Sequence, residues 1–420
     1  MSSIAQAQNP KAKPQTARAI VRSTAQADNP IIQPPSNLLT PITNPQTGQP
    51  DYAFPLQTAA WLKMQSVVKT AIAFPLTTDD FTNLYGSFTD EGAVTAAVAV
   101  LGQIQQTANE YGDPQTLISQ LVAFQQANTP PDSIYGNAVW LAAQTVTNAQ
   151  QIVSLLQEGL NDIGTETDPK QRIADLTELL TGAGGISSYA STLQGEITDF
   201  QTKTSKFYTT LNAELTGPTN SLQVYLKQDG NVYKDAQADV TADQNQIDTL
   251  NSTIDELNKE YIGFTVAASV SPVLVLIPFF GPVIAVADAI TFAVLASKVK
   301  EQIGKLKDQL SGVEVDEQKK TALVTQLGGF NLSVADVATD GAAFLDTIGT
   351  MASGWGEFQS QITLRLSSLT PADVQDWSAF MDKINFKAAV DGWNLIASKA
   401  ETFYQAGFVQ FTNQSSQGGN

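Results

Sequence analysis

The chain has 420 residues with 41 acidic and 23 basic side chains, so its net charge is −18 and its pI is near 4.3. It contains neither cysteine nor histidine, which excludes disulfides, thiolate nucleophiles, Cys/His zinc sites and Ser-His-Asp triads. The negative charge argues against nucleic acid as a partner and against electrostatic capture by an anionic membrane surface. No spacing of the remaining carboxylates, serines and lysines is typical of an active site, so we expect no enzyme, cofactor or metal site.

Residues 1–55 carry nine of the nineteen prolines and show no hydrophobic period. We predict that residues 1–50 form a flexible, Pro-rich arm; the alternative is a segment that wraps around the body or a neighbouring subunit. The first residues, MSSIAQAQNPKAKPQ, lack the apolar run of a secretory signal. We therefore expect any export to follow a non-classical route.

From Leu56 onward the hydrophobic pattern is helical. A first helix ends near Pro75, and further helices begin at Thr78-Asp79 and cover Glu91–Gln105. The Asp113-Pro114 pair is typical of a helix start with proline in the first turn. Either Asp132 or Ser133 is expected to cap the helix that follows.

Four long runs then place apolar residues at alternating steps of four and three. These runs are Ile134, Ala138, Leu141, Thr145, Asn148, Ile152, Leu155; Ile186, Ala190, Leu193, Ile197, Phe200, Thr204, Phe207, Leu211; Leu222, Leu226, Tyr233, Ala236, Val240, Ile247, Leu250, Ile254, Leu257, Tyr261; and Leu323, Leu327, Phe330, Val334, Val337, Phe344, Ile348, Met351, Trp355, Phe358, Ile362, Leu369. Such heptads predict long helices packed at shallow angles, at least one of them longer than 40 residues. The fold class is therefore all-α, an elongated bundle of coiled-coil-like helices.

Several residues interrupt these runs. Asp229 and Asp243 occupy positions of the third run, where they either specify register or mark exposed sections. Gly328-Gly329 is expected to kink the fourth run, and residues 311–317 to break the helix before it. Thr370-Pro371 predicts the start of another helix.

Between the third and fourth runs lies the most apolar part of the chain, Tyr261–Ala296, with Asp288 as its single charged residue. PFFGP at 278–282 divides it into two arms, Ile262–Ile277 and Val283–Ala296, which would be about 22 Å long as helices and thus too short to cross a bilayer alone. It is either a buried core hairpin or a membrane-active tip. Both arms are apolar nearly all round, which favours the membrane-active tip.

This apolar hairpin supplies the candidate functional residues. The predicted membrane-inserting residues are Phe264, Val266, Val270, Val273, Leu274, Val275, Leu276, Ile277, Phe279, Phe280, Val283, Ile284, Val286, Ile290, Phe292, Val294 and Leu295, and the predicted hinges are Gly263, Pro278, Gly281 and Pro282. Asp288 either lines a pore or complements the helix dipole at the start of the second arm. An apolar surface of this size must be covered in solution. We expect the Glu91–Gln105 segment and the aromatic C-terminal helix to cover it.

A long helical bundle interrupted by the almost uncharged segment GFTVAASVSPVLVLIPFFGPVIAVADAITFAVLASKVK resembles the α-helical pore-forming toxins. These include cytolysin A, the haemolysin BL and non-haemolytic enterotoxin components, and the xenorhabdolysin-type binary toxins. The resemblance covers about residues 56–410 at the level of architecture, and the Pro-rich arm departs from it. It implies a soluble monomer that releases its hairpin at a membrane and assembles into a ring, often with one or two related chains.

The sequence therefore divides into an arm (1–50), the first part of the body (51–260), an apolar head (261–297) and the second part of the body (298–420). The function it predicts is that of a pore-forming toxin subunit, one component of a multi-component cytolysin. Such a subunit would insert its apolar hairpin into the lipid of a target membrane and oligomerise with itself or with related components. The alternative is a translocator or structural coiled-coil protein of a secretion or injection apparatus, because such proteins also carry apolar hairpins between long helices.

Overall fold

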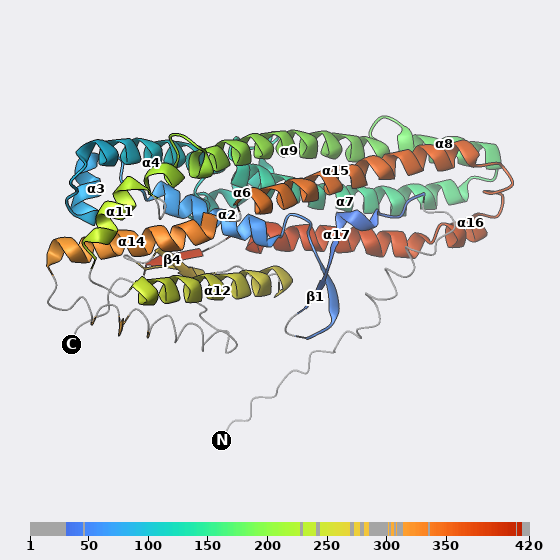
Figure 1. Cartoon of the computed structure of the whole chain (residues 1–420). Coiled ribbons are helices and arrows are strands. Elements are labelled where there is room, and N and C mark those ends of the chain that lie inside the picture. The colour runs from blue at the N-terminus through green and yellow to red at the C-terminus, as the bar shows by residue number, and fades with distance from the viewer. Residues whose placement is uncertain are drawn as a thin grey trace, which may run out of the picture.

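Helices form most of the elongated bundle seen in the computed structural model, which describes residues 31–44, 47–226, 230–240, 244–268, 273–277, 281–284, 301, 304–305, 308, 314–334, 337–408 and 410–413 (Figure 1). The helices are α2 (Ala59–Ile72), α3 (Thr78–Tyr85), α4 (Glu91–Tyr111), α5 (Pro114–Leu117), α6 (Leu121–Gln126), α7 (Ile134–Thr165), α8 (Pro169–Thr181), α9 (Ile186–Thr216), α10 (Leu222–Tyr225), α11 (Asn231–Ala238), α12 (Gln244–Ala268), α14 (Val315–Val334), α15 (Val337–Ser368), α16 (Trp377–Lys383) and α17 (Phe386–Ala406). Short 3₁₀ turns cover Ser36–Leu38 and Ile118–Gln120. The predicted all-α bundle is confirmed.

Two small sheets accompany the helices. Strands β1 (Thr40–Thr43) and β2 (Pro50–Ala53) form an antiparallel ribbon. Strands β3 (Val273–Ile277), β4 (Gly281–Ile284) and β5 (Gln410–Asn413) form a three-stranded sheet in the order β4-β3-β5.

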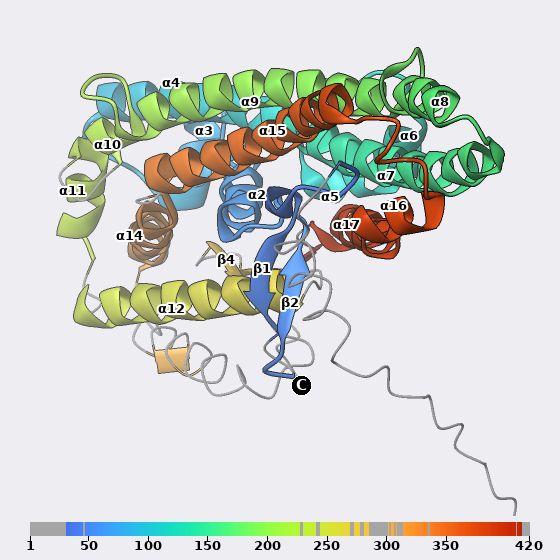
Figure 2. The same cartoon turned by 90° about the vertical axis from the view of Figure 1, so that its right-hand side faces the viewer.

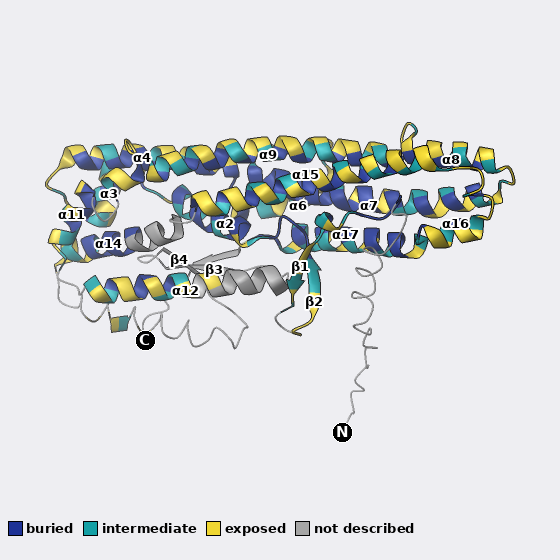
Figure 3. Ribbon diagram, turned by 45° about the vertical axis from the view of Figure 1, so that its right-hand side comes forward, coloured by how far each residue is buried: buried dark blue, intermediate teal, exposed yellow. Residues whose placement is uncertain are grey.

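The long axis of the bundle is built from two helix pairs, α9 with α15 and α7 with α17 (Figure 1). Every member of the run from Ile186 to Leu211 is buried in α9, as the heptad pattern predicts. Figure 3 shows the same division for the other long helices, with buried stripes facing inward and exposed stripes facing outward. The heptad spacing thus identifies the core faces correctly.

The expected helix of more than 40 residues is not found in the described part of the chain. The longest helices, α7 and α15, have 32 residues each, or about 48 Å. At the end of α7 the chain turns over residues 166–168, where the Glu166 carboxylate accepts the N–H groups of Thr167 and Asp168. Asp168 then caps α8, whose first residue is Pro169. These local hydrogen bonds compete with continuation of the helix.

The third heptad run is also divided, into α10, α11 and α12. Its members Leu222, Leu226, Tyr233 and Ile247 are nevertheless buried. The intervals between the three helices are residues 226–230 and 239–243, and they include Asp229 and Asp243, which themselves lie outside the described residues. The heptad spacing therefore predicted correctly which residues are buried, but it predicted wrongly that they lie on one continuous helix. Several short helices can bury residues of the same spacing without sharing one axis.

Two further boundaries differ from expectation. Helix α14 continues through Gly328-Gly329, so the helix is not broken there. Thr370-Pro371 does not begin a helix, because the Asp373 carboxylate accepts the backbone N–H and hydroxyl of Thr370 and holds a turn. Helix α16 begins only at Trp377, after the N-cap Asp376.

Other predicted caps are present. Asp113 accepts the N–H of Gln115 at the start of α5, with Pro114 as its first residue. Of the two candidates before α7, Ser133 is the cap, since its hydroxyl oxygen accepts the N–H of Gly136.

The N-terminal segment is packed against the body over residues 31–39, so this part of the predicted 1–50 arm is not free. Ile31, Ile32 and Leu38 are buried. The reason is that this part of the arm carries apolar side chains that can join the core, as the wrapping alternative required. Residues 1–30 lie outside the described residues.

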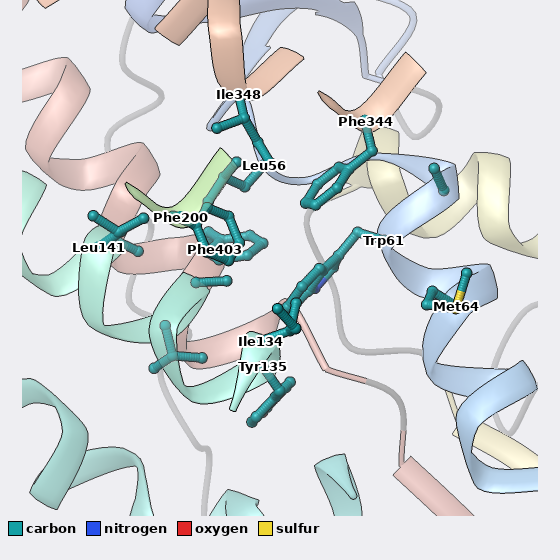
Figure 4. Packing of buried hydrophobic residues seen from close by; sticks show 14 of the residues in the cluster. Leu56, Trp61, Met64, Ile134, Tyr135, Leu141, Phe200, Phe344, Ile348 and Phe403 are labelled. Atoms are coloured by element: carbon teal, nitrogen blue, oxygen red, sulfur yellow. The ribbon is translucent and has the colours of Figure 1, made fainter. Parts of the chain in front are cut away.

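The centre of the core is the aromatic side chain of Trp61 on α2 (Figure 4). Its ring stacks on Tyr135 of α7, with centroids 5.9 Å apart, and on Phe344 of α15, at 5.7 Å. Phe403 of α17 lies 5.8 Å away. This one residue therefore joins three of the long helices, and its place at the start of α2 fixes how that helix enters the bundle.

A half-buried carboxyl group, that of Glu214, offers a test of the packing between α4 and α9. Burial raises the pKa of Glu214 above its usual 4.5, an effect that a hydrogen bond from Thr107 partly offsets. Since the folded-state pKa is raised, ionisation above it opposes folding, and the penalty is absent below pH 4.5. Glu214→Gln should therefore raise the melting temperature by roughly 1–3 °C at pH 7.5 and leave it unchanged at pH 4.

Thermal unfolding at both pH values measures this effect, with Glu256→Gln, an exposed change on α12, as the control. A melting temperature that falls at pH 7.5 in Glu214→Gln would mean that the carboxylate stabilises the contact between α4 and α9.

Candidate functional site

The predicted apolar hairpin is present as a chain reversal, but its central part is β-structure. Helix α12 continues into the apolar stretch as far as Ala268 and includes Gly263, Phe264 and Val266. Beyond it, β3 and β4 pair antiparallel, with Ile277 opposite Gly281 and Leu274 opposite Ile284. The reversal thus falls at residues 278–280, within PFFGP.

The expectation of two helical arms is corrected by these strands. Val273, Val275 and Ile277 of β3, like Val283 and Ile284 of β4, are β-branched and favour extended backbone. Pro282 lies in β4 opposite Leu276. Proline fixes one backbone dihedral and removes a donor, so it is tolerated in a strand at the edge of a sheet, which is where β4 lies.

The described residues include only some of the predicted site residues. Val273, Leu274, Val275, Leu276 and Ile277 are in β3, and Gly281, Pro282, Val283 and Ile284 are in β4. The remainder lie outside the described residues: Val270, Pro278, Phe279, Phe280, Val286, Asp288, Ile290, Phe292, Val294 and Leu295. Their roles stay predictions.

No sequence pattern indicated the third strand. Strand β5, four residues beyond the end of α17, pairs with β3 in parallel, with Val275 opposite Thr412 and Leu276 opposite Asn413. The apolar strand β3 is therefore the central strand, with a hydrogen-bonded neighbour on each side. We call β5 the C-terminal clasp. A four-residue QFTN segment carries no local signal strong enough to predict this pairing.

The clasp is held to the bundle just before it begins. The carbonyl oxygen of Gly407 accepts hydrogen bonds from Trp61 Nε1 and, at 3.0 Å, from Gln65 Nε2, both on α2. Phe408, the next residue, is buried. Because Gln65 is fully buried, loss of its bond would leave a polar group in the core without this acceptor. The core residue Trp61 thus also fixes the start of the clasp.

Helix α2 lies beside β4, as do α12 and α14, and α5 lies beside β5 (Figures 1 and 2). The described strands of the hairpin therefore have other neighbours than the predicted cover. We expected the Glu91–Gln105 segment and the aromatic C-terminal helix, whereas α2, α12 and α14 surround β4, and the strand after the C-terminal helix pairs with β3. The apolar face of α4 instead packs on α2 and α9.

Polar contacts attach α11 and α14 to the loop between α3 and α4. In the α3–α4 loop, Ser87 donates its N–H to Asp316 of α14 at 2.9 Å, and Thr89 donates its N–H to Asp235 of α11 at 2.9 Å. Gly86 has φ +89°, and a Cβ there would lie 2.8 Å from Asp316 Oδ1, so a side chain would disturb this loop. One loop therefore positions both α11, which precedes α12, and α14, which follows the hairpin.

A buried lysine joins the same two helices. Lys320 of α14 pairs with Asp239, just after α11, and with Asp316 at 3.7 Å; its side chain is 5% exposed. Its ammonium group also lies 5.4 Å from the centre of the Phe88 ring. Taking one of these carboxylates away would leave a buried cation with less compensation.

Neither a membrane-spanning helix nor a metal site is formed by the described residues. Among those residues, no helix is both long and apolar enough to cross a bilayer. Likewise, no three metal-ligating side chains come together in the part of the chain that the structure describes. What the site presents is an apolar β-hairpin held on a helical bundle.

No protein-family model matches this chain. No curated protein sequence matches it either.

Solved structures are similar to it. A Bacillus cereus HblL1 toxin component has 16% sequence identity and a TM-score of 0.50, with 83% of this chain and 94% of that chain covered. Soluble SmhA of the tripartite α-pore-forming toxin Smh from Serratia marcescens has 12% identity and a TM-score of 0.53, with 83% and 92% covered. At these identities the similarity shows the fold, and the resemblance to α-pore-forming toxins is confirmed at that level.

The clasp can be tested by weakening its attachment. Gln65→Leu removes one of the two donors to the Gly407 carbonyl and leaves the Trp61 donor, at a cost of about 0.5–1.5 kcal/mol. We expect faster amide hydrogen exchange in β3 and β5, and stronger binding of an apolar dye, while the exchange of α7 and α9 is unchanged.

Gln405→Leu, an exposed change on the neighbouring helix α17, is the matched control. If β3 and β5 exchange at the wild-type rate in Gln65→Leu, the Gly407 contact does not hold the clasp.

Proposed function

We propose that this chain is a subunit of an α-pore-forming toxin that stores an apolar hairpin on its bundle and inserts it into the lipid of a target membrane. The observation that carries the proposal is the pairing of β3, an unbroken apolar strand, with the C-terminal clasp. Similarity in fold to soluble toxin components supports the same function. The unit that inserts is residues 261–297, the head predicted from the sequence.

Storage as a central strand satisfies two physical needs in water. The sheet hydrogen bonds satisfy the backbone of β3 on both sides. An exposed apolar strand edge would otherwise pair with other chains and aggregate. Residues 273–277 read VLVLI and contain no charge that would prevent such pairing.

Insertion requires a different backbone conformation. Within the hydrocarbon of a bilayer, an open strand edge leaves N–H and C=O groups unsatisfied, at several kcal/mol each. A two-stranded hairpin that has left the clasp has such edges, so we infer that β3 and β4 become helical on insertion. Helix α12 already enters the apolar stretch, and its extension from Gln244 to Ile277 would give a helix about 51 Å long. Gly263, Pro278, Gly281 and Pro282 are the proposed hinges.

The driving force comes from the apolar side chains. Moving each Val, Leu, Ile or Phe from water into an apolar phase contributes about 1.5–3 kcal/mol, so the seventeen proposed inserting residues together contribute tens of kcal/mol. In the soluble form the same surface is held on the bundle, so only the difference between the two states drives insertion. We propose that assembly of several chains, either copies or related components, completes the pore, and that the protein acts outside the cell that makes it.

A charge within the hairpin should prevent insertion. Val275→Asp in β3 and Val286→Asp in the second arm each place a carboxylate in the membrane at a cost of about 2.5–3.5 kcal/mol. We expect liposome dye release on the order of 100-fold slower than wild type, with an unchanged helical circular dichroism spectrum.

Val122→Asp, at an exposed site on α6, is the control. Full dye release by both hairpin variants would contradict insertion of this segment. Absence of release by the wild-type chain, alone or with a co-encoded partner, would instead favour the structural coiled-coil alternative.

A crosslink tests whether the clasp must open. Val275 and Thr412 are opposite each other in β3 and β5, and the chain has no other cysteines. The double variant Val275→Cys/Thr412→Cys should therefore form one disulfide that traps the stored hairpin. We expect the oxidised protein to stay monomeric on liposomes and release at least ten-fold less dye, with recovery on reduction.

The two single cysteine variants control for the substitutions themselves. Undiminished release by the oxidised double variant would show that β3 stays beside the clasp during insertion.

A further inference from the structure

The N-terminal strap, which we define as residues 31–39, lies on the body as a peptide lies in a binding groove. Ile31, Ile32 and Leu38 are buried to 2% exposure or less. Pro35 has polyproline-like dihedrals (φ −61°, ψ 140°), and Pro34 precedes it. Such a segment loses little conformational entropy on docking, which is how Pro-rich peptides are recognised by apolar grooves.

Helices α15 and α17 provide the groove, and two glycines give the strap its space. A Cβ at Gly392 of α17 would lie 2.8 Å from Pro34 Cγ, and a Cβ at Gly354 of α15 would lie 3.0 Å from Asn37 Cγ. Trp355 and Trp393, beside these glycines in sequence, are fully buried with ring centroids 5.5 Å apart. The groove is therefore shaped for this peptide.

The strap and the body are also joined by hydrogen bonds from a side chain of each to the backbone of the other. Trp393 Nε1 donates to the carbonyl of Ile32 at 3.0 Å. Gln33 Nε2 donates to the carbonyls of Ile384 and Asn385, each at 3.0 Å. These bonds fix the register of the strap, so the groove has the geometry and the polar contacts of a specific peptide site.

The strap is connected to the body through a length of chain that could be released. The described residues between Leu39 and Phe54 form the β1–β2 ribbon, in which Thr40, Pro41, Thr43 and Pro50 are exposed and Asp51 pairs with Lys399 of α17 at 2.9 Å. A two-stranded ribbon is marginally stable in water. Fully extended, the fourteen residues from 40 to 53 would span about 46 Å.

The outward positions of this ribbon offer few N–H groups for pairing with other strands. Asn44 donates its N–H to Gln49, so residues 40, 42 and 44 face the partner strand and residues 41 and 43 face outward. Pro41 and Pro50 have no N–H to offer, and the outward N–H of Tyr52 bonds to Asp51 Oδ1. The ribbon is therefore poorly suited to pairing with another strand. When it opens, its residues can lengthen the connection between the strap and the body.

We propose that the strap is exchanged between copies of this chain, so that in the assembled form the strap of one subunit occupies the α15–α17 groove of the next. The partner is a second copy because the groove fits this sequence, residue by residue. Opening of the ribbon provides the reach, in the manner of domain swapping. The proposal rests on the proposed function only in that copies must assemble.

A cysteine pair in the full chain tests the exchange. In Asn37→Cys/Gly354→Cys, the sulfur of residue 37 replaces Cγ, the atom that lies 3.0 Å from the Cβ position of residue 354. Oxidation of the soluble protein should give an intrachain disulfide and a monomer. Oxidation after assembly on liposomes should give covalent oligomers on a non-reducing gel. In Asn37→Cys/Gly356→Cys the second cysteine faces Gln194, so neither product should form.

Closing the strap before assembly gives a second measurement. Protein oxidised in solution should release at least ten-fold less dye, with recovery on reduction. The exchange is wrong if assembled protein yields only intrachain disulfides, or if the pre-oxidised protein releases dye at the full rate. If wild-type protein neither assembles nor releases dye, the proposed function fails, and the exchange fails with it. Assembly and dye release without interchain disulfides would overturn the exchange alone.

Discussion

The pairing of one apolar strand on both of its edges is the interaction on which the rest of the structure depends. Strand β3 has no charged residue and lies between β4 and β5. If either neighbour were absent, one edge of β3 would expose unpaired N–H and C=O groups that can pair with another chain. One neighbour, β4, is local in sequence, and the other is the last described strand of the chain. The sheet therefore depends on a contact between segments that lie far apart in the sequence.

The two ends of the described chain use the bundle in similar ways. The C-terminal clasp begins at Gly407, whose carbonyl is held by two buried side chains of α2. The N-terminal strap lies against α15 and α17, with Trp393 and Gln33 holding its register. Each segment is extended, short and fixed by few polar bonds, and such elements open at a lower free energy than the long helices between them. This difference allows a stable body to carry movable ends.

How much of this the sequence predicts depends on the range of the interaction. The heptad run in α9 and the caps at Asp113 and Ser133 follow from neighbours within one or two turns, and they were predicted correctly. VLVLI in β3 is too short for its period to separate a helix from a strand. Its conformation is decided by pairing with β5, which lies far away in the sequence. The contacts of Ser87 with Asp316 and of Thr89 with Asp235 could not be predicted for the same reason, because the partners lie far apart in the sequence.

The proposed function depends on one step, in which the hairpin leaves its clasp when the protein meets a membrane. The most direct measurement is the distance between spin labels on Leu274 and Phe411, which are opposite each other in β3 and β5, in the cysteine-free background of this chain. In solution we expect a single short distance between the two labels. On liposomes that are releasing dye, we expect this distance to be lost and replaced by a longer, broader distribution. A short distance that persists in fully active, membrane-bound protein would show that the hairpin stays on its clasp.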